Sequence, residues 1–145
     1  MRGVLVATAE PWPKLRADPR LSDLFLEYGE EFEITPDPDW ALAHRLWMVH
    51  ELHAFALRND NALVGFCLCL THPILDRRGS FLALADKVYV KPAYRGDGTK
   101  LLLDCAMQFM RDAGAAYFSL HHAPTLGKFA PLGEAWSMRV WTKAL

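Results

Sequence analysis

The sequence has few cysteines, no excess of positive charge and no long apolar run. Its three cysteines, Cys67, Cys69 and Cys105, are an odd number set within apolar stretches, so no disulfide framework is visible and a cytoplasmic location is expected. Since the spacing of a metal site is also missing, we expect no metal and predict that these thiols are small core residues. The formal net charge of −1 argues against nucleic acid as a partner. No apolar run is as long as a membrane span, so no membrane partner is expected either.

The composition is that of a globular protein. The chain has 145 residues, of which 52% are hydrophobic and 23% charged, enough for one sizeable core. No repeat and no linker-like stretch divides it. We therefore expect residues 1–145 to form a single domain.

The spacing of apolar residues predicts strands and helices in mixed order. Strands are predicted at residues 3–8, 53–58, 62–72, 81–90, 115–122 and 134–145. Helices are predicted from Asp18 to about Tyr28, from Trp40 to about His50 after a cap at Asp37 or Asp39, and from Gly98 to about Ala113. Residues 10–19, with three prolines, are expected to break regular structure before the helix that starts near Asp18, and residues 123–133 to form a loop or a turn of helix. This order indicates an α/β or α+β fold with a central sheet. On the helix that starts at Gly98, one face is expected to be buried, formed by Leu101, Leu102, Cys105, Phe109 and Met110.

The joint between the strand at 81–90 and the following helix has an unusual composition. In "VYVKPAYRGDGTKLLL", residues 88–103, Pro92 ends the strand, and Arg95, Gly96 and Gly98 precede the helix. Glycine lets a ligand come close to main-chain N–H groups, and a helix N-terminus has unpaired donors and a partial positive charge. The joint therefore predicts a phosphate or pyrophosphate site with Arg95 as a cation at its rim, although glycines also suit such turns for geometric reasons alone. The spacing matches neither a Walker loop nor the dinucleotide-binding fingerprint.

The pattern Val90-x-Pro92-x-x-Arg95-Gly96-x-Gly98 resembles motif A of the GCN5-related N-acetyltransferases, the GNAT superfamily. The order of elements is similar over essentially the whole chain, most of all to short members from bacteria and their phages. The resemblance implies a mixed, largely antiparallel sheet that is splayed between the strand ending at Val90 and the strand at 115–121, with helices on both faces. It also implies that acetyl-CoA lies in this opening. The residues implied to bind it are Val88, Tyr89 and Val90 for the pantetheine, and Arg95, Gly96, Asp97, Gly98, Thr99, Lys100 and Leu101 for the pyrophosphate.

Two positions depart from the family pattern. Lys100 replaces a glycine or alanine, so its side chain could crowd the pyrophosphate, point outward or place an ammonium beside the phosphates. Glu134 stands where many members of the family have a tyrosine that acts as general acid, and a carboxylate donates a proton poorly unless its pKa is raised. Glu134 remains a candidate acid, Tyr117 or Tyr89 could replace it, or thiolate release needs no dedicated acid.

Asp86, His121 and His122 are the candidates for the general base. The resemblance implies a carboxylate four residues before Val90, which is the position of Asp86. Pairing with Lys87 or Arg95, or simple exposure, is an alternative reason for an acid in this strand. His121 and His122 end the next strand, where the cleft should open, and either could accept a proton or stabilise an oxyanion. Both would also suit a strand end as surface residues.

The resulting prediction is an acyltransferase that moves an acetyl group from acetyl-CoA to a primary amine of a small molecule or a protein lysine. The segment at 27–39 is rich in Asp and Glu, which would favour a cationic acceptor but also suits a solvated loop. The alternative is a catalytically weak GNAT fold that serves as an acyl-CoA-binding or protein-interaction module. The chain could also assemble as a homodimer.

Overall fold

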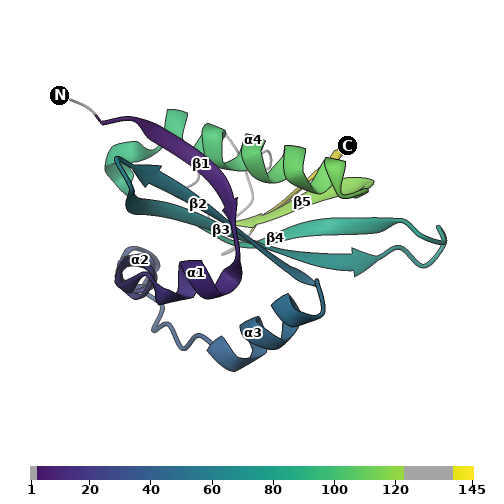
Figure 1. Ribbon diagram of the computed structural model, residues 1–145, viewed down its shortest axis with the longest axis horizontal. Helices are drawn as coiled ribbons and strands as arrows, with labels where there is room; N and C mark the ends of the chain where they lie inside the picture. The colour runs from purple at the N-terminus through teal and green to yellow at the C-terminus, as the bar shows by residue number, and fades with distance from the viewer. Residues whose placement is uncertain (1–2, 123–138) are drawn as a thin grey trace.

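The computed structural model describes residues 3–122 and 139–145 and places six strands in one sheet (Figure 1). The sheet order is β1-β2-β3-β4-β5-β6, and every neighbouring pair is antiparallel except β4–β5. This confirms the mixed, largely antiparallel sheet. The strands are β1 (Leu5–Glu10), β2 (Leu52–Asn59), β3 (Ala62–Pro73), β4 (Phe81–Val90), β5 (Tyr117–His122) and β6 (Arg139–Ala144). The loop or helical turn expected at 123–133 lies outside the described residues.

The helices begin largely where the sequence predicts. They are α1 (Trp12–Ala17), α2 (Pro19–Phe32), α3 (Trp40–Met48) and α4 (Asp97–Asp112), with a 3₁₀ turn η1 (Pro92–Tyr94). Asp18 and Asp39 cap α2 and α3, accepting hydrogen bonds from the main-chain N–H groups of Arg20 at 3.0 Å and Leu42 at 2.9 Å. No helix within 3–122 and 139–145 has the length and hydrophobicity needed to cross a membrane.

Helix α1 is a correction to the prediction of an irregular chain between Glu10 and the helix start near Asp18. Pro11 precedes this helix and Pro13 lies in its first turn, where a missing N–H costs no helical hydrogen bond. Trp12 and Leu15 are completely or almost completely buried, so α1 is held by its apolar side chains. Because three prolines lie within ten residues, the sequence pattern did not indicate that Trp12 and Leu15 belong to a helix.

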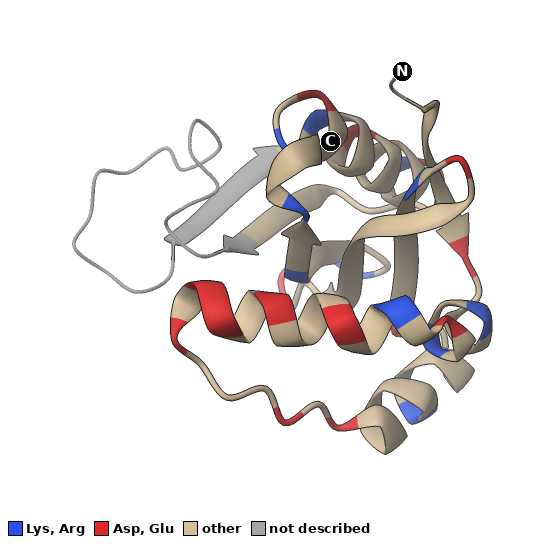
Figure 2. Cartoon of the chain, turned by 90° about the vertical axis from the view of Figure 1, so that its left-hand side faces the viewer, with Lys and Arg blue, Asp and Glu red and all other residues tan. Residues whose placement is uncertain are grey.

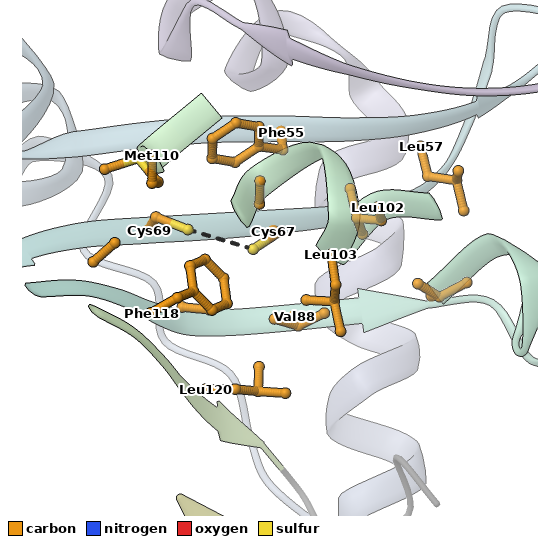
Figure 3. Close-up of a cluster of buried hydrophobic side chains, with 14 of the residues drawn as sticks. Phe55, Leu57, Cys67, Cys69, Val88, Leu102, Leu103, Met110, Phe118 and Leu120 are labelled. Atoms are coloured by element: carbon orange, nitrogen blue, oxygen red, sulfur yellow. Dashed lines mark hydrogen bonds between the residues drawn. The ribbon is translucent and has the colours of Figure 1, made fainter. Parts of the chain in front are cut away.

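Helices cover both faces of the sheet: α4 lies on one face and α1, α2 and α3 on the other (Figure 1). The core under α4 contains Cys67 and Cys69 from β3, whose Sγ atoms lie 3.7 Å apart (Figure 3). Both thiols are fully buried and burial raises the pKa of Cys69, as expected of core residues, whereas Cys105 is half-buried. Among the described side chains, no group of three or more His, Cys, Asp or Glu could hold a metal ion.

The buried face of α4 differs from the predicted one. Leu102 and Met110 are fully buried as expected, but Leu101 and Phe109 are each 40% exposed. The residues that face the sheet are instead Gly98, Thr99, Leu102, Leu103, Ala106 and Met110. Three consecutive leucines at 101–103 fit several helix faces, and the small residues Gly98 and Ala106 select the one that allows close approach to the sheet.

The sheet opens between β4 and β5. These two strands pair only from Leu82–Tyr117 to Ala85–Leu120, and the rest of β4 has no partner on that side in the described chain. On the other side of β4, Leu68 of β3 pairs with Lys87 and Cys69 pairs with Ala85. Asp86 is therefore an extra residue of β4 with no partner on β3. A bulge of this kind bends a strand and increases its twist. This geometry confirms the splay expected between the two strands.

Candidate functional site

The joint between β4 and α4 presents main-chain donors to open space. Gly96 has φ +85° and ψ −104°, a conformation that favours glycine, and its helix-capping position carries no side-chain hydrogen bond. The first helical bond runs from Lys100 N–H to Gly96 O at 3.0 Å, so the N–H groups of residues 97–99 have no acceptor within the helix. A Cβ built on Gly96 would meet no atom within 4 Å. The turn therefore combines uncapped amides with open space beside Gly96, two features of an anion site.

Gly98 has a packing role that the sequence alone did not indicate. A Cβ at this position would lie 3.0 Å from Leu57 Cδ2 and 3.8 Å from Leu5 Cδ1. Gly98 thus faces β1 and β2 and lets α4 approach the sheet closely. Its glycine is a packing requirement, while its N–H remains one of the donors at the helix start.

A pocket of about 410 Å³ lies beside this joint. Its walls come from η1 and the start of α4 on one side and from Leu5 and Asn59 on the other. Asn59 donates a hydrogen bond to Tyr94 Oη at 3.1 Å, but its buried Oδ1 has no partner among the described residues. Nothing in the local sequence indicated Asn59, because β2 and η1 meet only in the fold.

The open edge of β4 exposes a short row of main-chain groups. The Lys91 N–H donates to Val64 O of β3 at 2.9 Å, so the alternation of a strand directs the main-chain groups of Tyr89 toward β3 and those of Val88 and Val90 toward the opening. Arg95 Nε already donates to Val90 O at 2.9 Å. The N–H and C=O of Val88 and the N–H of Val90 are left for an extended ligand, in contrast to the expectation that Tyr89 also contributes its main chain.

Arg95 is not a free cation at the rim. Its Nη1 and Nη2 donate to the two carboxylate oxygens of Glu31 on α2, at 2.6 Å and 2.5 Å. This bidentate pair lowers the pKa of Glu31 and raises that of Arg95. The expected cation is therefore neutralised by a carboxylate 64 residues away, which no local pattern revealed.

A second ion pair lies beside the first. Lys91 Nζ is 3.0 Å from Glu27 Oε1, and Tyr89 Oη donates to Glu27 Oε2 over 3.5 Å. Burial, with smaller contributions from Glu31 and Glu27, raises the pKa of Tyr89 to about 12. Tyr89 therefore holds its proton tightly and is a poor candidate for the general acid.

Lys100 lies along the surface of α4. Its Nζ is 2.5 Å from Asp104 Oδ2, one helical turn further on, and both side chains are half-exposed or more. Of the three orientations considered for Lys100, the structure thus has the one that leaves the start of the helix open.

Asp86 lies at the point where the sheet divides. The last parallel pair is Ala85–Leu120, so Asp86 and His121 are the first residues beyond it on each strand. Asp86 is exposed and has no hydrogen bond or ion pair within the described chain. Its two expected partners contact other groups: Lys87 Nζ lies 4.2 Å from the ring centroid of Tyr28, and Arg95 pairs with Glu31. Within the described residues Asp86 thus pairs with neither Lys87 nor Arg95, and the other alternative, simple exposure, stays open beside the catalytic one.

The remaining catalytic candidates are placed only in part. His121 and His122 belong to β5, where their main chains pair with Val140 and Arg139 of β6, while their side chains and Glu134 lie outside the described residues. Tyr117 pairs with Leu82 at the closed end of β4–β5, away from the opening. Tyr117 is thus badly placed to act as the acid.

Comparison with known proteins identifies the fold. The model of the "Acetyltransferase (GNAT) family" matches residues 18–128. No curated protein sequence matches the chain. Among solved structures, an aminoglycoside acetyltransferase from an uncultured soil metagenomic sample, in complex with sisomicin, superposes with a TM-score of 0.67 at 19% identity, covering 87% of this chain and 82% of its own.

Two further structures superpose over a similar length. A ribosomal-protein-alanine N-acetyltransferase from Brucella melitensis biovar Abortus 2308 has a TM-score of 0.59 at 23% identity, covering 86% of this chain and 84% of its own. A predicted acetyltransferase with acetyl-CoA from Clostridium acetobutylicum has a TM-score of 0.65 at 13% identity, with the same two coverages, 86% and 84%. At these identities the three structures share the fold with this chain.

Proposed function

The chain belongs to the GNAT family of acetyltransferases, and from this premise we propose that it transfers an acetyl group from acetyl-CoA to a primary amine of a small molecule or a protein. The observation that carries the proposal is the uncapped start of α4 after Gly96, next to the open edge of β4. We call the start of α4 after Gly96 and the open edge of β4 at Val88 and Val90 the cofactor cradle. A binding module without catalysis would need the same cradle, so the catalytic part of the proposal rests on Asp86 and on the histidines at the end of β5.

The cradle fits the cofactor in two parts. The N–H groups at the start of α4 suit a pyrophosphate, because they combine unpaired donors with the positive end of the helix dipole. The open edge at Val88 and Val90 suits the amides of a pantetheine chain, which would pair with it as a strand does. The absence of any atom within 4 Å of a Cβ at Gly96 leaves room for the phosphates.

Acetyl-CoA, when bound, supplies an activated thioester carbonyl. The chain must then remove a proton from the acceptor, because an amine is mostly an ammonium ion at neutral pH. Asp86 is the first candidate, since it is exposed at the division of the sheet and free of ion pairs within the described residues. A histidine at 121 or 122 is the second, since β5 brings both to the same end of the sheet.

The acceptor side carries negative charge. Figure 2 shows acidic residues along α2 and on the segment that joins it to α3. Two of these carboxylates, Glu27 and Glu31, are neutralised by ion pairs, whereas Glu30, Glu33 and Asp37 are exposed and unpaired within the described chain. Three free carboxylates on α2 and the segment that follows it would favour a cationic acceptor. Aminoglycosides and a protein's alanine are named as acceptors for two of the structural neighbours, which supports an amine but does not choose between a small molecule and a protein.

An acetyl-transfer assay tests the proposal. The protein is mixed with acetyl-CoA and a panel of polyamines, aminoglycosides and lysine-containing peptides, and both free thiol and acetylated amine are measured. Transfer to at least one cationic amine, faster than to matched neutral amines, is the expected result. CoA binding without transfer to any amine would favour the binding-module alternative.

The base is assigned with the same assay. Once an acceptor is found, the rate is measured against pH for Asp86→Asn, His121→Ala and His122→Ala. A histidine base gives a limb in the pH–rate profile near the pKa of that histidine, which is lost in its variant. If all three variants keep the wild-type rates and profiles, catalysis by positioning alone becomes the better account.

A further inference from the structure

Two parallel ion pairs join α2 to the cofactor cradle. Glu27 and Glu31 lie one turn apart on α2, and their partners Lys91 and Arg95 are also four residues apart, on either side of η1. The buried apolar residues of α2 in the core below the sheet are Leu21, Leu24 and Phe25, with Tyr28 and Phe32 partly buried against the same core. The two ion pairs add charged links between the second half of α2 and the joint.

Arg95 is the central link in this arrangement. One nitrogen donates to Val90 O, the last outward carbonyl of β4, and the other two hold both oxygens of Glu31. The guanidinium carbon also lies 5.5 Å from the ring centroid of Tyr89. Charge-assisted bidentate bonds are the strongest and most directional that an arginine makes, so this fork has one orientation. Its side chain is only 23% exposed.

The position of Arg95 determines where the cradle amides point. Arg95 directly precedes Gly96, which has no side chain to hold it and no neighbour within 4 Å of a Cβ. The main-chain contact of Arg95 itself is a long one, from its N–H to Pro92 O at 3.4 Å. The side chain of Arg95 is therefore the firmest attachment of the chain immediately before the turn.

We infer that Glu31 is a positioning residue for cofactor binding, which acts through Arg95 to hold the Gly96 turn and the Val90 end of β4 in the geometry that accepts acetyl-CoA. This inference rests on the proposed function. Arg95 serves as a link between α2 and the cradle rather than as a side-chain ligand of the phosphates. Since α2 continues into the acidic segment at 33–39, the same link fixes the acceptor side relative to the cofactor.

A direct contact between Arg95 and the phosphates would predict the opposite change in CoA affinity when the charge of Glu31 is removed. If Arg95 bound the phosphates directly, Glu31 would compete with them, and removing the Glu31 charge would strengthen CoA binding. If Glu31 positions the cradle, removing its charge weakens CoA binding. A double-mutant cycle on CoA affinity therefore separates the two roles.

The experiment measures the Kd of CoA by calorimetry for the wild type, Glu31→Gln, Arg95→Gln and the double variant. Asp23→Asn is the matched control, because it removes one negative charge from the exposed surface of α2 and Asp23 has no partner among the described residues. Each single variant is expected to weaken CoA binding about tenfold, the double variant no more than either single one, and the control not at all. Glu31→Asp keeps the charge with a shorter reach and should recover part of the affinity. Thermal unfolding of each variant, followed without CoA, sets a titration temperature at which all of them are folded.

Three outcomes would overturn the inference. Tighter CoA binding by Glu31→Gln would assign Arg95 to the phosphates, and unchanged binding would show that Glu31 does not position the cradle. Additive losses in the double variant would show that the two residues act independently. A lower unfolding temperature with an unchanged Kd would leave Glu31 a purely structural role. Absence of CoA binding by the wild-type chain would instead defeat the proposed function, and the inference with it.

Discussion

Replacing Gly96 by alanine tests the cradle at its most sensitive point. Gly96 has φ +85° and ψ −104°, a region open essentially to glycine alone, and another residue held there costs about 1–3 kcal/mol. At this chain length each kcal/mol lowers Tm by about 3 °C, so Gly96→Ala should lower Tm by about 3–9 °C. The new Cβ meets no neighbour, so this loss comes from the backbone alone. A turn that relaxes to relieve the strain reorients the N–H groups of residues 97–99, and CoA binding should weaken about tenfold or more.

Gly79 provides a matched control for this strain. It has φ +80°, and a Cβ there would also meet nothing within 4 Å, but it lies in the loop between β3 and β4. Gly79→Ala should therefore also lower Tm and leave the Kd of CoA unchanged. Differential scanning calorimetry and titration calorimetry measure the two quantities. Equal effects of both variants on CoA affinity, or no effect of either, would refute the placement of the pyrophosphate at Gly96.

Three further predictions address catalysis, packing and pH. Asp86→Asn should lower turnover at neutral pH by about 10²–10⁴-fold and leave CoA affinity intact; an unchanged turnover in steady-state assays would remove Asp86 from the mechanism. Met110→Ala, at a fully buried site, should cost about 2–5 kcal/mol in urea unfolding and Phe109→Ala, at a site 40% exposed, clearly less; the reverse order would mean that α4 presents its other face to the sheet. Because the pKa of Tyr89 is raised from 10.0 to about 12, its contribution to stability is complete below pH 10 and is lost as the pH rises from 10 to 12. Tyr89→Phe should therefore lose less stability than the wild type over that range, and identical stability–pH curves would contradict the raised pKa.

The elements that sequence reasoning placed correctly depend on local chemistry. The start of α2 near Asp18, the cap of α3 at Asp37 or Asp39, and the strands at 53–58 and 62–72 are each set by residues a few positions apart. Of the two capping candidates it is Asp39 that accepts a hydrogen bond, from Leu42 N–H at 2.9 Å. The fold class follows from the order of such elements.

The features that sequence reasoning missed depend on contacts between distant segments. The ion pair of Arg95 with Glu31 and the extra residue at Asp86 exist only when α2, β3 and β4 are assembled. The four-residue spacing of the two acids on α2 was visible in the sequence, but their partners were not. Gly98 was assigned to the ligand because a glycine at a helix start suits close approach by a phosphate or by a packed strand, and only the fold distinguishes the two.

Backbone amide chemical shifts during a CoA titration test the central claim most directly. The protein is labelled with ¹⁵N, its amides are assigned, and CoA is added until the shifts no longer change. The account predicts that the largest shifts fall on Gly96, Asp97, Gly98 and Thr99 and on the open edge at Val88 and Val90, with Gly79 unaffected. Shifts confined to other parts of the chain, or no shifts at millimolar CoA, would contradict the assignment of the β4–α4 joint as the cofactor site.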